Sequence, residues 1–126
     1  MREWEGKKYW LVGASEGLGA ALAKTMVKAG AEVVISSRSQ DKLDAMVLEL
    51  DGKVFSQVVD VSDRKSVERA VAAIGDVDGV VFLAGVYWPM KSQEWKSREA
   101  ELMADINFTG AIRVLGAVMP QMQARG

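Results

Sequence analysis

The chain alternates short apolar runs with stretches in which apolar residues recur every three or four positions. The runs predict strands, and the three- or four-residue spacing predicts helices. In chain order the predicted elements are strand 8–12, helix 17–29, strand 32–36, helix 40–50, strand 53–59, helix 63–74 and strand 79–84. The runs 33–35 and 80–83 are apolar without alternation, which is typical of parallel strands buried on both faces. This order predicts an α/β fold in which right-handed helical crossovers cover a parallel sheet.

The first predicted helix has one apolar face, which we expect to pack on the sheet. The face has the spacing of a buried helix surface and consists of Leu18, Ala21, Leu22, Thr25, Met26 and Ala29. Gly30 follows as a stop signal. Ser39 and Ser62 are the expected N-caps of the next two helices.

After Gly85 the pattern changes to a loop with Tyr87, Trp88 and Pro89, and then to a long helix from about Ser97 to Gln123. Three residues are expected to weaken this helix locally, namely Gly110, Gly116 and Pro120. The segment therefore differs from the regular alternation that precedes it.

Composition narrows the possible functions. With 126 residues, 49% of them apolar, and a net charge of -1, residues 1–126 are expected to form one domain. The basic residues are scattered, which argues against nucleic acid and against a charged membrane patch. No apolar run approaches the roughly 20 residues of a membrane span, and charges in Met1–Glu5 argue against a signal peptide. We expect a cytoplasmic protein whose partners are small molecules or its own copies.

Cysteine and histidine are both absent from the sequence. Their absence excludes disulfides, thiol nucleophiles, imidazole bases and the usual transition-metal ligands. No metal site is therefore expected, and any chemistry must use other groups.

A glycine-rich segment lies between the first strand and the first helix. Its sequence is Gly13-Ala14-Ser15-Glu16-Gly17-Leu18-Gly19. Gly13 allows the chain to reverse, Gly17 allows a phosphate to approach the backbone, and Gly19 allows close packing of the helix. A bare turn before a helix N-terminus predicts an anion site for a dinucleotide pyrophosphate, whereas the simpler interpretation is an ordinary strand-to-helix turn.

The spacing G-x-x-x-G-x-G differs from the better-known G-x-G-x-x-G fingerprint and resembles that of the short-chain dehydrogenase/reductase family. The resemblance implies a Rossmann-like, doubly wound parallel sheet with strand order 3-2-1-4. It covers nearly the whole chain but only the first half of the family's fold, because the chain ends where a fifth strand is expected.

Asp60-Val61 resembles the family's Asp-Val pair, whose carboxylate accepts a hydrogen bond from the adenine amino group. The alternative is that Asp60 caps the next helix, since Asp60, Ser62 and Asp63 all suit that role. Position in the family pattern favours adenine.

The end of the second strand decides the choice between NAD(H) and NADP(H) in this family. Ser37 and Arg38 stand where NAD-using members place an acidic side chain. A guanidinium can bind a 2′-phosphate through paired, charge-assisted hydrogen bonds, so NADP(H) is preferred over NAD(H). Glu16 argues mildly against this preference, and a solvated Arg38 is the alternative interpretation.

Two further segments match the family in part. Phe82-Leu83-Ala84-Gly85 keeps only the Ala-Gly half of the family's Asn-Asn-Ala-Gly, which still permits close approach to the nicotinamide ribose. Asn107 resembles the asparagine that holds a water in the family's proton relay, and its alternative role is an amide that bonds the backbone near Gly110.

The family's catalytic serine and Tyr-x-x-x-Lys pair have no counterpart in this chain. Tyr87 and Lys91 have the right spacing, but Pro89 between them disfavours the helix that would bring them to one face. We interpret the chain as the NADP(H)-binding portion of an oxidoreductase, inactive alone. The alternatives are a self-contained, non-enzymatic nucleotide-binding or interaction module, and a chain completed by a partner.

An incomplete fold would leave apolar surface uncovered. The fourth strand would be an edge, and the long helix would expose Val114, Leu115 and Val118. We therefore expect a homo-oligomer joined through the fourth-strand edge or through the long helix.

Overall fold

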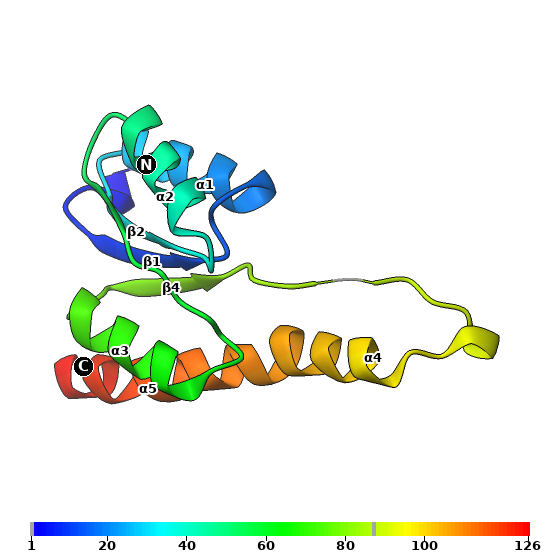
Figure 1. Cartoon of the computed structure of the whole chain (residues 1–126). Helices are drawn as coiled ribbons and strands as arrows, with labels where there is room; N and C mark the ends of the chain where they lie inside the picture. Colours follow the sequence, from blue (N-terminus) through cyan, green and yellow to red (C-terminus); the bar gives the residue numbers. More distant parts are fainter. Residues whose placement is uncertain (1, 87) are drawn as a thin grey trace.

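The computed structural model describes residues 2–86 and 88–126, which build one parallel sheet between two layers of helices (Figure 1). The strands are β1 (Lys8–Val12), β2 (Glu32–Ser36), β3 (Val54–Ser56) and β4 (Gly79–Phe82). The helices are α1 (Gly17–Lys28), α2 (Gln40–Glu49), α3 (Arg64–Ile74), α4 (Ser97–Ala104) and α5 (Gly110–Arg125), with 3-10 turns η1 (Arg2–Trp4) and η2 (Ser92–Glu94) and a π-helical turn η3 (Asp105–Thr109). The strand order β3-β2-β1-β4 confirms the predicted 3-2-1-4 arrangement.

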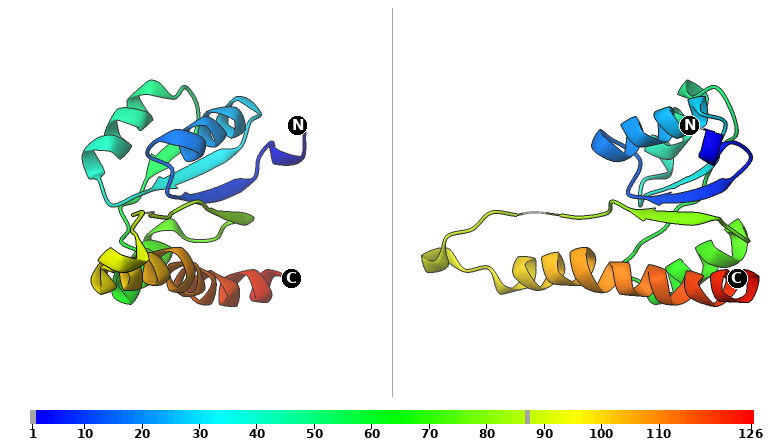
Figure 2. Two further views of the ribbon diagram at one scale, coloured as in Figure 1. Left: turned by 90° about the vertical axis from the view of Figure 1, so that its right-hand side faces the viewer. Right: turned by 180° about the vertical axis from the view of Figure 1, so that it is seen from behind.

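Alternate residues of the strands face opposite helical layers. Leu11, Val33 and Ile35 belong to the core beneath α1 and α2, whereas Trp10 and Val34 belong to the core that includes residues of α3 and α5. Figure 2 shows the two layers on opposite sides of the sheet. Residues 33–35 of β2 are buried on both faces, as predicted, whereas residues 80–83 at one edge of the sheet are only half-buried.

The last and third predicted strands are shorter in the structure. β3 ends at Ser56 rather than near residue 59, and β4 ends at Phe82 rather than near residue 84. Single backbone bonds continue beyond the strands, with Val59 N donating to Ser37 O at 2.9 Å and Leu83 N donating to Val12 O at 2.7 Å. The chain diverges from the ladder where the loops turn outward.

The predicted buried face of α1 is wrong in phase. Leu18 is 74% exposed, and Ala21 and Thr25 are also exposed. Met26 is buried as predicted, but the other buried residues of α1 are Gly19, Ala23 and Val27. Gly19 packs so closely on Gly13 and Ala14 that a Cβ would not fit, and this contact sets the rotation of the helix.

One of the two predicted caps is confirmed. Ser39 is the N-cap of α2 and accepts a hydrogen bond from Lys42 N at 3.4 Å. The N-cap of α3 is Asp63, which accepts from Lys65 N at 3.0 Å, rather than Ser62. Ser62 donates its hydroxyl to Asp60 and is therefore part of the preceding turn.

The long helix is continuous from α4 through η3 into α5. Val114 and Val118, predicted to be exposed, are each 1% exposed because they pack in the core shared with α3. The exposed large apolar residues of η3 and α5 are instead Phe108, Ile112, Leu115 and Met119, so the prediction holds only for Leu115. We call these four residues the exposed row.

The stretch Ser97–Arg125 has 29 residues and is, by length and composition alone, long and apolar enough to cross a membrane. This differs from the expectation that no segment reaches that length. The stretch contacts α3, and it contains the ion pair between Asp105 and Arg113. Part of its apolar content thus serves the protein core.

Residues 83–86 lead away from the sheet, and residues 88–96 pass through η2 before the chain returns as α4 (Figures 1 and 2). Trp88 and Pro89 are exposed on this excursion. Tyr87, which the sequence places in the same loop and in the rejected Tyr-x-x-x-Lys match, lies outside the described residues.

Candidate cofactor site

A cavity of about 350 Å³ opens at the carboxyl ends of the strands. It lies where the connections from β1 lead to one side of the sheet and those from β4 to the other, the position at which open α/β sheets bind ligands. Its lining comprises Val12, Gly13, Ser15, Glu16, Ser37, Arg38, Ser39, Lys42, Val59, Asp60, Val61, Leu83, Ala84, Gly85, Val86 and Ile106.

Nine of the predicted site residues line this cavity, namely Gly13, Ser15, Glu16, Ser37, Arg38, Asp60, Val61, Ala84 and Gly85. Gly17, Leu18 and Gly19 form the first turn of α1 beside Glu16, and Asn107 follows Ile106. Lys42 also lines the cavity and was not among the residues predicted from the sequence. The available signal was its position three residues after the Ser39 cap, on the first turn of α2.

The glycine loop is shaped by close backbone approach. Gly13 has φ +90°, and a Cβ there would lie 2.5 Å from Ala84 N, so the loops after β1 and β4 touch. Gly17 has φ +61°, and apart from its own helix and chain neighbours no atom lies within 4 Å of the point that a Cβ would occupy, so the space on that side is open. The first contact requires glycine for packing, and the second leaves room for a ligand.

The N-terminus of α1 has no side-chain cap. Glu16 occupies the N-cap position without accepting a hydrogen bond there, and the first turn has no acidic residue. By contrast, Ser39 and Asp63 cap α2 and α3. Free N–H groups and the helix dipole favour an anion at the first turn of α1, next to the cavity.

Two cations lie at the end of the cavity near α2. Arg38 is exposed, and within residues 2–86 and 88–126 no carboxylate lies in ion-pair range of it. Lys42 Nζ lies 3.3 Å from Glu16 Oε2. Because both of these side chains are more than half exposed, the pair is weak and its partners can exchange.

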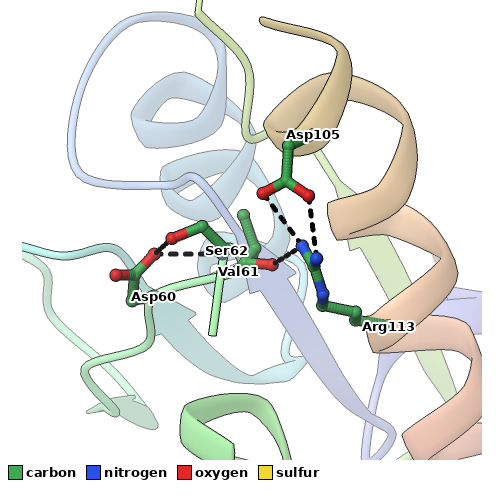
Figure 3. Close-up of polar contacts among 5 residues, drawn as sticks. All are labelled: Asp60, Val61, Ser62, Asp105 and Arg113. Carbon is green, nitrogen blue, oxygen red and sulfur yellow. Dashed lines mark hydrogen bonds and ion pairs between the residues drawn. The ribbon is translucent and has the colours of Figure 1, made fainter. Parts of the chain in front are cut away.

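Asp60 is held in a tight turn by its neighbours (Figure 3). Its Oδ1 accepts hydrogen bonds from Ser62 N at 3.0 Å and from Ser62 Oγ at 2.6 Å, while its N–H donates to Ser66 Oγ at 2.9 Å. The helix-capping alternative is not observed, because Asp63 is the cap of α3. Asp60 therefore lines the cavity, and the Oδ1 of its carboxylate is held within the turn.

Asn107 pairs with the loop after β4. Its Oδ1 accepts from Val86 N at 2.7 Å, and its Nδ2 donates to Val86 O at 2.8 Å. The alternative role near Gly110 is therefore wrong, although the amide does bond backbone. A Cβ on Gly85 would lie 3.1 Å from Asn107 Oδ1, so this loop and the π turn fit closely.

In the part of the chain that the structure describes, no group of acidic, cysteine or histidine side chains could hold a metal ion.

A parallel 3-2-1-4 sheet with a glycine loop at its switch point defines a Rossmann-type dinucleotide-binding fold. A family model described as short chain dehydrogenase matches residues 7–126, and the chain belongs to this family.

Similar proteins agree with this assignment. The chain is 33% identical to an uncharacterized oxidoreductase of Staphylococcus haemolyticus, with 100% of this chain and 57% of that protein covered. It is 32% identical to an L-xylulose reductase of Bos taurus, with 96% of this chain and 49% of that protein covered. A short-chain type dehydrogenase/reductase structure from Mycobacterium ulcerans superposes with a TM-score of 0.90 at 29% identity, covering 98% of this chain and 49% of that one.

The chain thus spans about half the length of these relatives. Family membership implies a nicotinamide cofactor, and the residues around the cavity fit such a group. They offer an uncapped helix N-terminus for phosphates and a carboxylate for an amino group. The interpretation as a self-contained, non-enzymatic module is not favoured.

Proposed function

We propose that this chain binds NADP(H) as the cofactor-binding portion of a short-chain dehydrogenase/reductase. The observation that carries the proposal is the convergence of the uncapped α1 N-terminus, Arg38 and Asp60 on one cavity. The bound nicotinamide would supply hydride transfer to or from a carbonyl or alcohol carbon. L-xylulose reductase, to which the chain is similar, is a reductase by name.

Each part of the cavity has a distinct role in this proposal. The first turn of α1, with the open backbone of Gly17, binds the pyrophosphate. The Asp60 carboxylate accepts a hydrogen bond from the adenine amino group, and Val61 packs beside the base. Ala84 and Gly85 allow the nicotinamide ribose to approach the backbone.

The preference for NADP(H) rests on charge. Arg38 is free to bind a 2′-phosphate, and Lys42 can leave its exposed pair with Glu16 to join it. In either position the positive charge of Lys42 offsets the negative charge of Glu16 near the phosphate. With Lys42 beside it, Glu16 is a weaker argument against NADP(H) than Glu16 alone would be.

We also propose that the chain does not catalyse hydride transfer by itself. Asn107 is the one residue matching the family's proton relay, and the serine and Tyr-x-x-x-Lys have no counterpart. A cytoplasmic homo-oligomer is proposed, joined through the β4 edge or through the exposed row. β4 pairs with β1 on one side, and all four of its residues are only half-buried.

The experiment that tests this proposal is a titration of the 126-residue chain with NADPH and NADH, followed by tryptophan fluorescence. We expect saturable binding with NADPH the tighter ligand. R38L is expected to weaken NADPH by about tenfold or more and to leave NADH unchanged, because hydrogen bonds to charged groups contribute about 1.5–3 kcal/mol. R69L, on the exposed face of α3, is the matched control.

Two variants test the second cation in the same titration. E16Q should tighten NADPH by about two- to threefold, and K42M should weaken it by a similar factor, as expected for an exposed ion pair. Absence of binding to either nucleotide would contradict the proposal. Equal affinity for both would contradict only the preference for NADP(H).

A further inference from the structure

Arg113 on α5 does not line the cavity. It bonds two segments next to the cavity, one at Val61 and one at Asp105 (Figure 3). Its Nη1 donates to Val61 O at 2.9 Å, across 52 residues of chain. Its two terminal nitrogens also reach both oxygens of Asp105, with Nη2–Oδ1 at 2.8 Å and Nη1–Oδ2 at 3.2 Å. The guanidinium thus bonds a backbone carbonyl and a carboxylate at the same time.

The environment of this contact strengthens it. The Arg113 side chain is 17% exposed and that of Asp105 is 32% exposed. Hydrogen bonding from Arg113 lowers the pKa of Asp105, and the same contact raises the pKa of Arg113. Both groups stay charged, and a planar fork held on two oxygens fixes the geometry of its third acceptor.

Both bonded segments carry residues of the cavity. Val61 follows Asp60, whose carboxylate belongs to the same turn. Asp105 opens the π turn and directly precedes Ile106, which lines the cavity, and Asn107, which holds Val86. The Asp60–Val61 turn also fits closely against α5, because a Cβ on Gly110 would lie 3.0 Å from Val61 Cγ2.

We propose that Arg113 is a positioning residue that fixes the Asp60–Val61 turn for adenine and couples it to the π turn that carries Asn107. The proposal rests on the proposed function for its adenine readout. The coupling of the two segments can be measured without any nucleotide.

Arg125, on the same helix, offers a matched control. Its Nη1 donates to Val77 O at 2.8 Å, and its Nη2 lies 3.0 Å from Asp78 Oδ1. It therefore makes the same type of carbonyl and carboxylate contact, but at the opposite end of the sheet from the cavity.

The first measurement is amide hydrogen exchange on the nucleotide-free chain. R113M is expected to speed exchange by about tenfold in both 60–63 and 105–109, whereas R125M should do so only around 75–79. Unchanged protection in either of the first two segments would overturn the coupling. If R113M does not fold, R113K gives the same comparison with a smaller effect, since a single ammonium lacks the planar fork that bonds the carboxylate and the carbonyl together.

The second measurement compares NADPH with its hypoxanthine analogue, which replaces the 6-amino group by a carbonyl oxygen. Wild type and R125M should bind NADPH about tenfold more tightly than the analogue, because the analogue presents an acceptor to the Asp60 carboxylate. R113M should reduce this ratio toward one, and R113K should partly restore it. General destabilisation would weaken both ligands alike and leave the ratio intact.

The outcomes separate the two proposals. An unchanged ratio in R113M would overturn the positioning role while leaving cofactor binding in place. Failure of wild type to bind either nucleotide would contradict the proposed function and the adenine role of Arg113. The exchange result would then still decide the coupling.

Discussion

Trp10 Nε1 donates a hydrogen bond to Ser36 Oγ at 2.7 Å, deep between β1 and β2. Both side chains are almost completely buried, at 1% and 0% exposed. The carbonyl of Ser36 in turn accepts from Gly13 N at 2.8 Å and from Ala14 N at 3.1 Å. One residue of β2 therefore satisfies the buried indole and anchors the start of the glycine loop.

S36A is expected to lower the free energy of unfolding by about 1–3 kcal/mol, because the buried indole N–H loses its acceptor. Urea unfolding followed by fluorescence measures the change. S56A is the control, since Ser56 makes only a long contact of 3.5 Å with Gln40, and it should change stability by less than about 0.5 kcal/mol. Equal effects of the two substitutions would contradict the role assigned to Ser36.

G17A and G6A separate backbone strain from ligand binding. Both glycines have positive φ, +61° and +74°, with open space where a Cβ would lie. Each substitution should therefore destabilise the fold by about 1–2 kcal/mol. Only G17A should also weaken NADPH, by about tenfold or more, because the first turn of α1 must stay bare for phosphate. Similar NADPH affinity of the two variants would place the pyrophosphate elsewhere.

The exposed row predicts self-association. Its spacing of four, three and four residues puts Phe108, Ile112, Leu115 and Met119 on one side of the helix. We expect sedimentation at micromolar concentration to show a dimer or larger species, and L115E to shift it toward monomer. L48E is the control, because Leu48 is 89% exposed on α2, away from the row. A monomeric wild type would exclude this interface and the β4 edge together.

The Asp105–Arg113 pair predicts a stability change at acidic pH. The folded pKa of Asp105 lies below its ordinary value, so the unfolded chain takes up the proton first as the pH falls. The stabilisation is complete above the unfolded pKa of about 3.9 and is lost as the pH falls through the folded pKa.

D105N should therefore flatten the acid-side decline of the unfolding free energy by up to about 1 kcal/mol, a limit set by the partial exposure of the pair. Urea unfolding at a series of pH values below neutrality measures the decline. R113M should flatten it to a similar extent. A profile of D105N parallel to that of wild type would show that the pair contributes nothing to acid sensitivity.

Local pattern predicted most of the fold. The apolar runs placed the strands and the glycines placed the loop after β1, because strand burial and turn chemistry depend on adjacent residues. The strand order and the other cavity residues were predicted only from the resemblance to the family. The rotation of helices was not predicted. Leu18 and Val114 were assigned to the wrong sides, because periodicity gives the width of an apolar face but not which neighbour sets its phase.

The parts of the site that could not be predicted from the sequence depend on contacts between residues far apart along the chain. Lys42 meets Glu16 across 26 positions, and Arg113 meets Val61 across 52. Contacts across such sequence separations cannot be predicted from the local spacing of residues or from composition. The cap assigned to Ser62 failed for a local reason, since Asp63 competes for the same role and Ser62 is bonded to Asp60.

The π turn at Asp105–Thr109 accommodates one more residue than a regular helical turn would. Removing a single residue there would replace the π turn by a regular α-helical turn, and the residues within it, Asn107 among them, would change position. Asn107 could then no longer meet both backbone groups of Val86. The number of residues in this turn therefore cannot change without loss of the contact with Val86. Deletions within the turn should be tolerated far less than substitutions on the exposed side of the helix.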